Sequence, residues 1–420
     1  MTKLAGARKS MSLDRSEFAV DCVQWAVERA AACESIPQLL DSYCRFLRHQ
    51  GIGVRRCNLK TDTIHPQMWA MRYVWFSEHA DPGPINPSVI VRRRQHPMGD
   101  AFIDEVFFFA SGHTSPQYIA SPFYRIEQDG EMLAAIAPAG APQPYPVFND
   151  LALLGCTQYF GTMLHGLGTA HKLISVAVDN AGGLSDGDVQ KVRMSAHLLA
   201  LPLNTLLQHE IKNTIARTYI GRDPGQRVCD GMIELGHVAA LEGAIWFSDI
   251  RGFTRMSETL RPDELVARLN AYYREIVGAI YAHSGEVLKF VGDAVLAIFP
   301  AQTCGGAQEA CEAALAAASR ARQRAQTSEE GQALEDGVAL HFGVAEYGNI
   351  GAPDRLDFTL IGREVNLAAR AKELMVRTGE PIVCTRAFQK AANQSMRAVG
   401  SFEAKGLSEP VELFAPIGLT

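Results

Sequence analysis

Two short segments constrain the fold of this chain most, one beginning at Ala244 and the other at Val287. The first, AIWFS, is apolar almost throughout and predicts a buried strand that ends at Asp249. The second, VLKFV-GD-AVLAIF, predicts a β-hairpin whose turn presents Asp293. Mg²⁺ is typically held in proteins by one or two carboxylates together with substrate phosphates. A strand end and a turn that each present one carboxylate therefore predict a divalent cation site.

The residues after this strand favour phosphate binding. Gly252 permits a close approach of the backbone to a ligand, and Thr254 places a hydroxyl near the start of the next helix. We expect the backbone amides of Gly252, Phe253 and Thr254 to contact phosphate oxygens.

The elements around these segments follow a regular order. The expected elements are, in sequence, strand 242–248, helix 258–282, hairpin 285–299, helix 305–325, strand 338–346, a strand and helix over 357–377, and short terminal strands. A helix, two strands and a helix after an opening strand predict an α+β domain with a ferredoxin-like βαββαβ core.

A third motif, GREVNLAAR from Gly362 to Arg370, makes the region from about residue 242 to 414 resemble the catalytic domain of class III nucleotidyl cyclases. The resemblance implies conversion of ATP to 3′,5′-cyclic AMP and pyrophosphate, with two Mg²⁺ or Mn²⁺ ions per active site. It implies that Asp249, Asp293 and the carbonyl of Ile250 hold the metals. The alternative interpretation is that Asp249 only caps a strand and Asp293 only forms a turn. Either role is common for a single aspartate, but the occurrence of both within matched motifs favours metal binding.

Further site residues come from the same resemblance. Asn366 and Arg370 lie four residues apart and so project from one helical face. The resemblance implies that the asparagine orients the ribose and the arginine stabilises charge on the transferring phosphate, which suits a guanidinium fork. Lys405 resembles the family's phosphate-binding lysine. The alternative interpretation is an exposed Asn–Arg pair and a surface lysine.

Base selection is expected at Lys289 and Thr359. Lys289 can donate to the adenine ring, and Thr359, three residues before Gly362, can pair with the exocyclic amine. Guanylate-specific relatives typically carry Glu and Cys or similar residues there, so we expect ATP as the substrate. The Lys–Thr pair resembles a bacterial subgroup of the family. A guanylate cyclase is the first alternative.

One chain holds the metal residues and the Asn/Arg pair. Because the family builds its site across a head-to-tail dimer, the resemblance implies a homodimer with two equivalent sites. A P-loop NTPase or kinase is disfavoured, since the chain has no Gly-x-x-x-x-Gly-Lys-Ser/Thr run. A catalytically weak cyclase-fold ligand sensor is the remaining alternative.

The N-terminal half has a different pattern. Residues 1–15 are predicted to be a disordered N-terminal segment. Residues 16–185 are predicted to form helices and then strands, followed by a closing helix that begins at about Asp186. That order resembles an α/β GAF-like sensor domain, so we expect a small molecule or another signal to act there and regulate a catalytic domain over 241–420. None of His49, His65, His79, His96, His113 or His171 forms a recognisable haem or metal motif.

Residues 186–240 are predicted to be a signalling helix and connector. Apolar side chains recur there at the spacing of a coiled-coil seam, listed as Val192, Ala196, Leu199, Leu203 and Leu206. We expect this helix to pair in the dimer, with Pro202 as a kink or a junction between helices. The alternative is a core helix of the N-terminal domain. Residues 219–228 resemble the connector found upstream of bacterial cyclase domains.

Composition excludes several classes of protein. A net charge of −6 leaves no basic excess for neutralising nucleic-acid phosphates, so no nucleic-acid partner is expected. The nine cysteines show no Cys-x-x-Cys pair, which favours reduced thiols. No apolar run reaches the ~18 residues of a membrane span, and residues 1–15 lack the apolar core of a signal peptide. These features predict a cytoplasmic protein with no membrane partner.

Overall fold

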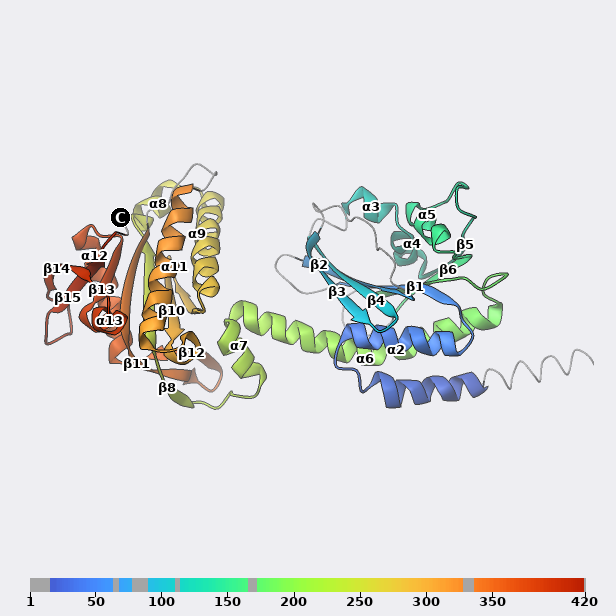
Figure 1. Cartoon of the computed structure of the whole chain (residues 1–420), viewed down its shortest axis with the longest axis horizontal. Helices are drawn as coiled ribbons and strands as arrows, with labels where there is room; N and C mark the ends of the chain where they lie inside the picture. The colour runs from blue at the N-terminus through green and yellow to red at the C-terminus, as the bar shows by residue number, and fades with distance from the viewer. Residues whose placement is uncertain are drawn as a thin grey trace, which may run out of the picture. The chain divides into compact units, whose positions relative to one another are not determined.

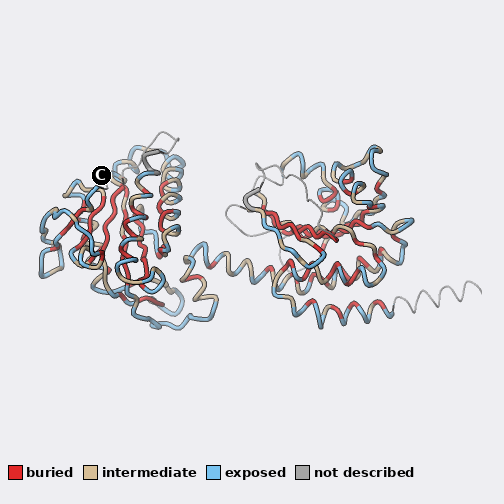
Figure 2. Tube along the Cα trace, viewed as in Figure 1, coloured by how far each residue is buried: buried red, intermediate tan, exposed pale blue. Residues whose placement is uncertain are grey.

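The chain divides into two compact units, Met1–Thr214 and Ile215–Thr420. The computed structural model describes residues 16–62, 68–77, 90–109, 114–164, 172–327 and 336–418. Each unit has its own buried core (Figure 2). Among the helices of these described ranges, none combines the length and the apolar composition that a membrane crossing requires.

The N-terminal unit is built on a seven-stranded sheet in which all described pairings are antiparallel (Figure 1). Its strands are β1 (Val54–Asp62), β2 (Met68–Phe76), β3 (Ile90–Met98), β4 (Ala101–Phe109), β5 (Glu131–Ala135), β6 (Gln158–Met163) and β7 (Lys172–Val178). Their order across the sheet is β3-β4-β2-β1-β7-β6-β5. The predicted strand-like segments of this half are therefore confirmed, although its GAF-like identity stays a prediction.

Helices cover both faces of this sheet (Figure 1). One face packs against the helix over residues 16–25, its continuation η1 (Ala26–Ala30), α2 (Ile36–His49) and the long α6 (Asp186–Tyr219). The other face carries α3 (Pro116–Ile119), α4 (Pro122–Asp129) and α5 (Pro146–Leu153). Phe18, Cys22 and Trp25 of the first helix are buried against the first face.

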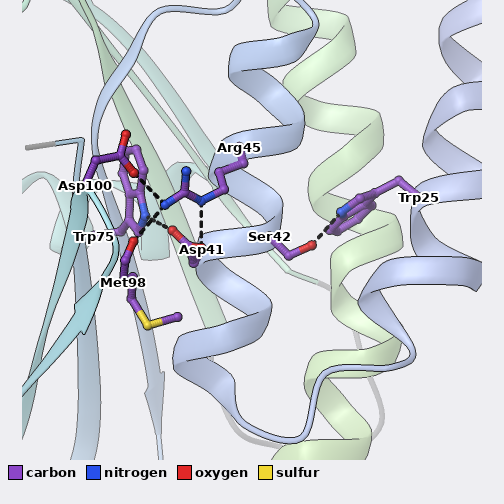
Figure 3. Close-up of polar contacts among 7 residues, drawn as sticks. All are labelled: Trp25, Asp41, Ser42, Arg45, Trp75, Met98 and Asp100. Atoms are coloured by element: carbon purple, nitrogen blue, oxygen red, sulfur yellow. Dashed lines mark hydrogen bonds and ion pairs between the residues drawn. The ribbon is translucent and has the colours of Figure 1, made fainter.

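Polar contacts join α2 to the sheet and to the first helix (Figure 3). Arg45 donates to Asp41, to the backbone carbonyl of Met98 and to Asp100, each at 2.8 Å. The Trp75 indole N–H donates to the other oxygen of Asp41 at 2.7 Å. Asp41 lies on α2 and accepts a hydrogen bond from Trp75 of β2, so it ties α2 to the sheet.

Helix α6 corrects one prediction. Val192, Ala196, Leu199 and Leu203 are each at most 1% exposed and belong to the core of the N-terminal unit. Leu206 packs against the same core. Their spacing therefore reflects a helix covering a sheet, and the interpretation as a coiled-coil seam is wrong for these residues. Pro202 lies inside the helix without ending it.

The C-terminal unit is built on an eight-stranded sheet. Its strands are β8 (Val238–Ile250), β9 (Glu286–Val291), β10 (Ala294–Pro300), β11 (Asp336–Ala352), β12 (Arg355–Ile361), β13 (Ile382–Thr385), β14 (Met396–Phe402) and β15 (Val411–Pro416). The order is β14-β15-β13-β11-β8-β10-β9, with β12 paired to β11. The helices are α7 (Arg222–Cys229), α8 (Phe253–Thr259), α9 (Pro262–Ala282), α10 (Ala301–Cys304), α11 (Ala307–Thr327), α12 (Arg363–Thr378) and α13 (Arg386–Ala392).

The predicted βαββαβ core is present in this unit. Strand β8 leads through α9 to the hairpin β9–β10, and α11 then leads to β11, which returns to pair with β8. The expected helix over 258–282 is two helices, α8 and α9, because Leu260 and Arg261 between them have extended backbone.

The two faces of this sheet are covered by different helices. Trp246 of β8 lies in the core shared with α9 and α11, whereas its neighbour Ile245 lies in the core shared with Val365 and Ala368 of α12. Successive strand residues point to opposite faces of a sheet. Helix α12 therefore lies on the face opposite to α9 and α11, where it can carry site residues from outside the main core.

Candidate active site

The two candidate metal carboxylates lie together, as predicted. Asp249 is the next-to-last residue of β8, and Asp293 lies in the turn between β9 and β10. Strand β10 pairs directly with β8, which brings the turn to the end of β8. The backbone N–H of Ile250 donates to Asp293 at 3.1 Å. Ile250, the third predicted ligand, thus lies between the two carboxylates.

The carboxyl groups of Asp249 and Asp293 influence each other. Burial, followed by the hydrogen bond and the charge of Asp249, raises the pKa of Asp293 to about 6. Burial also pushes the pKa of Asp249 upward, but hydrogen bonds with Asp293 and Lys372 bring it below its ordinary value. Two carboxyls this close favour sharing one proton when no cation balances their charge.

A lysine from α12 already contacts this pair. The ammonium of Lys372 donates to Asp249 Oδ2 at 2.7 Å, with both side chains about three-quarters buried. Sequence reasoning missed this residue. A lysine two positions after Arg370 was the available signal, but nothing local indicated that its side chain reaches β8.

The remaining donor set fits a divalent cation. Two carboxylates next to a backbone carbonyl are hard oxygen ligands, and substrate phosphates would complete the shell. No group of three or more His, Cys, Asp and Glu side chains suited to a metal exists within the described ranges.

Asn366 and Arg370 lie on α12 as predicted, one turn apart. Asn366 is exposed, and Arg370 forms its ion pair with Glu373 at 2.7 Å. Lys372, which contacts Asp249, lies about 160° around the helix from Arg370 and about 120° from Asn366, at 3.6 residues per turn. Asn366 and Arg370 therefore project away from the metal carboxylates of their own chain.

The two candidate base-selecting residues lie on β9 and β12, two strands that do not pair in the sheet but are joined by an ion pair. Lys289 lies on β9 and forms a 2.6 Å ion pair with Asp357 of β12. Thr359 lies two residues along β12 from Asp357, so both side chains point to the same face. Asp357 was not predicted. Lys289 is about half exposed, and the Lys289 ammonium lowers the pKa of Asp357.

The candidate phosphate-binding residues occupy two separate loops. Gly252 has the left-handed backbone conformation, with φ of 72°, and precedes α8, whose first residues are Phe253 and Thr254. Lys405 is exposed in the turn between β14 and β15. No contact joins Lys405 to the carboxylate pair among the described residues.

One buried histidine also supports the site and was not predicted. His341 of β11 is fully buried, and its ring nitrogens lie 2.7 Å from Thr385 Oγ1 and 2.7 Å from Glu364 of α12. Burial lowers the pKa of His341 despite the opposing effect of Glu364. This contact fixes the first turn of α12, just before Asn366.

Comparison with known proteins matches the C-terminal unit to a family. Residues 240–408 match the family described as Adenylate and Guanylate cyclase catalytic domain. Adenylate cyclase 1 of Rhizobium meliloti is 26% identical over 379 residues, covering 85% of this chain and 56% of the relative. The terminal-differentiation specific adenylate cyclase of Dictyostelium discoideum is 32% identical over 193 residues, covering 44% of this chain and 9% of the relative.

Solved structures give a similar match. The adenylyl cyclase CyaB from P. aeruginosa is 31% identical, covers 42% of this chain and 94% of its own, and superposes with a TM-score of 0.38. The guanylyl cyclase Cya2 is 29% identical, covers 42% and 92%, and superposes with a TM-score of 0.38.

Proposed function

Because residues 240–408 match the family described as Adenylate and Guanylate cyclase catalytic domain, we propose that this chain is an adenylate cyclase. It converts ATP to 3′,5′-cyclic AMP and pyrophosphate at the interface of a homodimer. The N-terminal unit regulates that reaction in response to a signal.

The orientation of α12 carries the homodimer part of the proposal. Lys372 faces Asp249 of its own chain, while Asn366 and Arg370 project about 120° to 160° away around the helix. A single chain therefore does not present both halves of a cyclase site to one substrate. Two chains arranged head to tail complete two equivalent sites.

Each side chain then has a defined role. Asp249 and Asp293, with the Ile250 carbonyl, hold two Mg²⁺ or Mn²⁺ ions. Such ions, when bound, activate the ribose 3′-oxygen and offset the charge of the departing pyrophosphate. Asn366 of the partner subunit orients the ribose, and Arg370 of the partner subunit donates to the transferring phosphate. The amides of Gly252, Phe253 and Thr254 and the ammonium of Lys405 bind the remaining phosphates.

ATP is the proposed substrate because of the side chains on β9 and β12. Lys289 offers a donor to the adenine ring, and the Thr359 hydroxyl can accept from the exocyclic amine. Asp357 accepts from Lys289 and so holds its ammonium at the face that carries Thr359. The relative that aligns over most of this chain is named Adenylate cyclase 1 of Rhizobium meliloti, and this name supports the same substrate.

The decisive experiment mixes two inactive variants. Asp249→Ala removes a metal ligand and Arg370→Ala removes the transition-state donor, so each homodimer should be inactive. In a heterodimer one site carries both lesions and the other carries none. If subunits exchange freely, half of the dimers are mixed, and about a quarter of the wild-type cyclic AMP production should return.

The matched control mixes Asp249→Ala with Asp293→Ala. Both changes lie on the same half of the site, so every site in the heterodimer keeps one lesion and no activity should return. Recovery in the control, or no recovery in the first mixture after exchange is verified by mass, would refute the shared site. An inactive wild-type chain that still binds ATP would favour the ligand-sensor alternative.

A further inference from the structure

Four cationic side chains lie on one face of the N-terminal sheet. Lys60 of β1 lies opposite Arg72 of β2 in the sheet. Val106 of β4 lies opposite Arg72 on one side and Arg93 of β3 on the other, so these three cations share a face. Arg56 lies four residues before Lys60 on β1 and so shares its face. The alternate residues of β1, such as Cys57, belong to the core with α2 and α6. The cationic face is therefore the opposite one.

Two of these four cations are neutralised by carboxylates. The Lys60 ammonium lies 2.9 Å from Asp62 and 2.8 Å from Glu127. Arg93 Nε lies 2.6 Å from Asp104, which is 1% exposed. The acidic side chains on this face are thus already engaged.

Arg56 and Arg72 are different. Within the described residues, neither guanidinium has an ion pair, and the Nε atom of each is buried without a hydrogen-bond partner. Each guanidinium lies over a phenyl ring: Arg56 Cζ is 5.6 Å from the ring centroid of Phe76, and Arg72 Cζ is 5.2 Å from that of Phe108. Burial, and then the charge of Arg56, lowers the pKa of Arg72 to about 10.

The arrangement is unfavourable for an empty protein. Each guanidinium is half-buried, and its buried Nε atom loses hydration without gaining a compensating bond, while the two like charges repel each other. Asn58, between Arg56 and Lys60 on the same strand face, also has a buried amide oxygen without a partner. Such groups are retained where a ligand satisfies them.

Against the larger lowering by burial, the charges of Asp150 and Asp104 raise the pKa values of Arg56 and Arg72 respectively, but among the described residues neither carboxylate forms an ion pair with them. The hydrophobic cluster beneath α4 and α5 includes residues of β5, β6 and β7, but among the described residues it includes none of β1 to β4. The guanidiniums are flanked instead by phenyl rings. A guanidinium fork matches the oxygens of a carboxylate or phosphate, and phenyl rings suit an apolar or aromatic body.

We propose that this face binds a small organic anion, with Arg56 and Arg72 donating to its carboxylate or phosphate group and the neighbouring phenyl rings packing on its apolar or aromatic body. The binding does not depend on the catalytic unit. Control of cyclic AMP production by the anion rests on the proposed function.

The first test measures thermal unfolding of the full chain with three probes, namely benzoate, phenyl phosphate and inorganic phosphate, each against potassium chloride of equal ionic strength. At least one organic probe should raise the unfolding midpoint of the N-terminal unit. Benzoate acting alone identifies a carboxylate site, and phenyl phosphate acting alone a phosphate site. Arg56→Gln and Arg72→Gln should each remove the effect.

The control is Arg94→Gln, which removes the same charge from an exposed position of β3 and should keep the effect. A second readout needs no ligand: Arg72→Gln should unfold at or above the wild-type midpoint, because it removes a half-buried charge whose Nε atom has no partner among the described residues. A structural role for Arg72 predicts a lower midpoint. The proposal is overturned if no probe exceeds the chloride control, or if both arginine variants keep the stabilisation.

A third measurement separates binding from control. The stabilising probe should change the rate of cyclic AMP production by the wild type and leave that of Arg72→Gln unchanged. If the probe binds but the rate does not respond, the anion site stands and the regulatory part of the proposed function fails. If the chain makes no cyclic AMP, the binding result is unaffected.

Discussion

The contact between Lys372 and Asp249 shows how one residue affects the candidate metal site. Replacing Lys372 with Gln frees Asp249 and removes a positive charge next to the site, so Mn²⁺ should bind the nucleotide-free chain about two- to fivefold more tightly, as expected for a partly exposed ion pair. Calorimetric titration of Mn²⁺ without nucleotide measures this. Lys390→Gln, an exposed lysine on α13, is the control and should change nothing. Equal or weaker affinity in Lys372→Gln would mean that this lysine does not compete with the cation.

Base selection is also decided by single residues. Lys289→Glu combined with Thr359→Cys exchanges donors and acceptors at the base. Two lost hydrogen bonds of about 1 kcal/mol each should lower the ATP-to-GTP ratio of kcat/KM by about tenfold or more. Thr359→Ser keeps the hydroxyl and should retain the preference. An unchanged ratio in the double variant would place nucleotide selection elsewhere.

At the scale of elements, His341 anchors α12 to β11 and β13 through Glu364 and Thr385. Its pKa is lowered by burial, so the unfolded chain binds the proton more readily. The stability that the neutral ring contributes is present above the unfolded pKa of about 6.5, and it is lost as the pH falls through that value toward the folded pKa. His341→Gln should therefore lower the free energy of unfolding at neutral pH by about 1–3 kcal/mol. On acidification the variant should lose less of its remaining stability than the wild type does. Urea unfolding at neutral pH and about one unit below 6.5 checks both effects; parallel pH dependence in the variant and the wild type would contradict them.

At the scale of the whole molecule, the two units have separate cores and should unfold separately. Leu203→Ala empties space in the N-terminal core, where this side chain is fully buried, and should destabilise that unit by about 2–5 kcal/mol. Calorimetry should show only the N-terminal transition shifted. The control is Leu201→Ala on the same helix, since Leu201 is 64% exposed. An unshifted N-terminal transition in Leu203→Ala would contradict the assignment of this side chain to the N-terminal core.

The sequence by itself determined the local elements and which residues end them. Alternation and apolar runs predicted β8 and the β9–β10 hairpin, because the side-chain period of a strand is local. The meeting of Asp249 with Asp293 followed from a strand end and a turn within matched motifs. The βαββαβ order was predicted for the same reason, since it depends on the succession of elements.

Only the tertiary structure decided which partner each face meets. The spacing of Val192, Ala196, Leu199 and Leu203 is the same for a core helix and a paired helix, because both bury a side chain every three or four residues. Lys372 reaches Asp249, and Asp357 reaches Lys289, across more than sixty positions of sequence. In the sequence Arg56 and Arg72 resemble ordinary strand cations, and only the sheet register shows that they share a face. Among the described residues neither has a carboxylate partner in an ion pair. Such contacts depend on how strands are ordered, which the chain specifies through its whole core and not through any one segment.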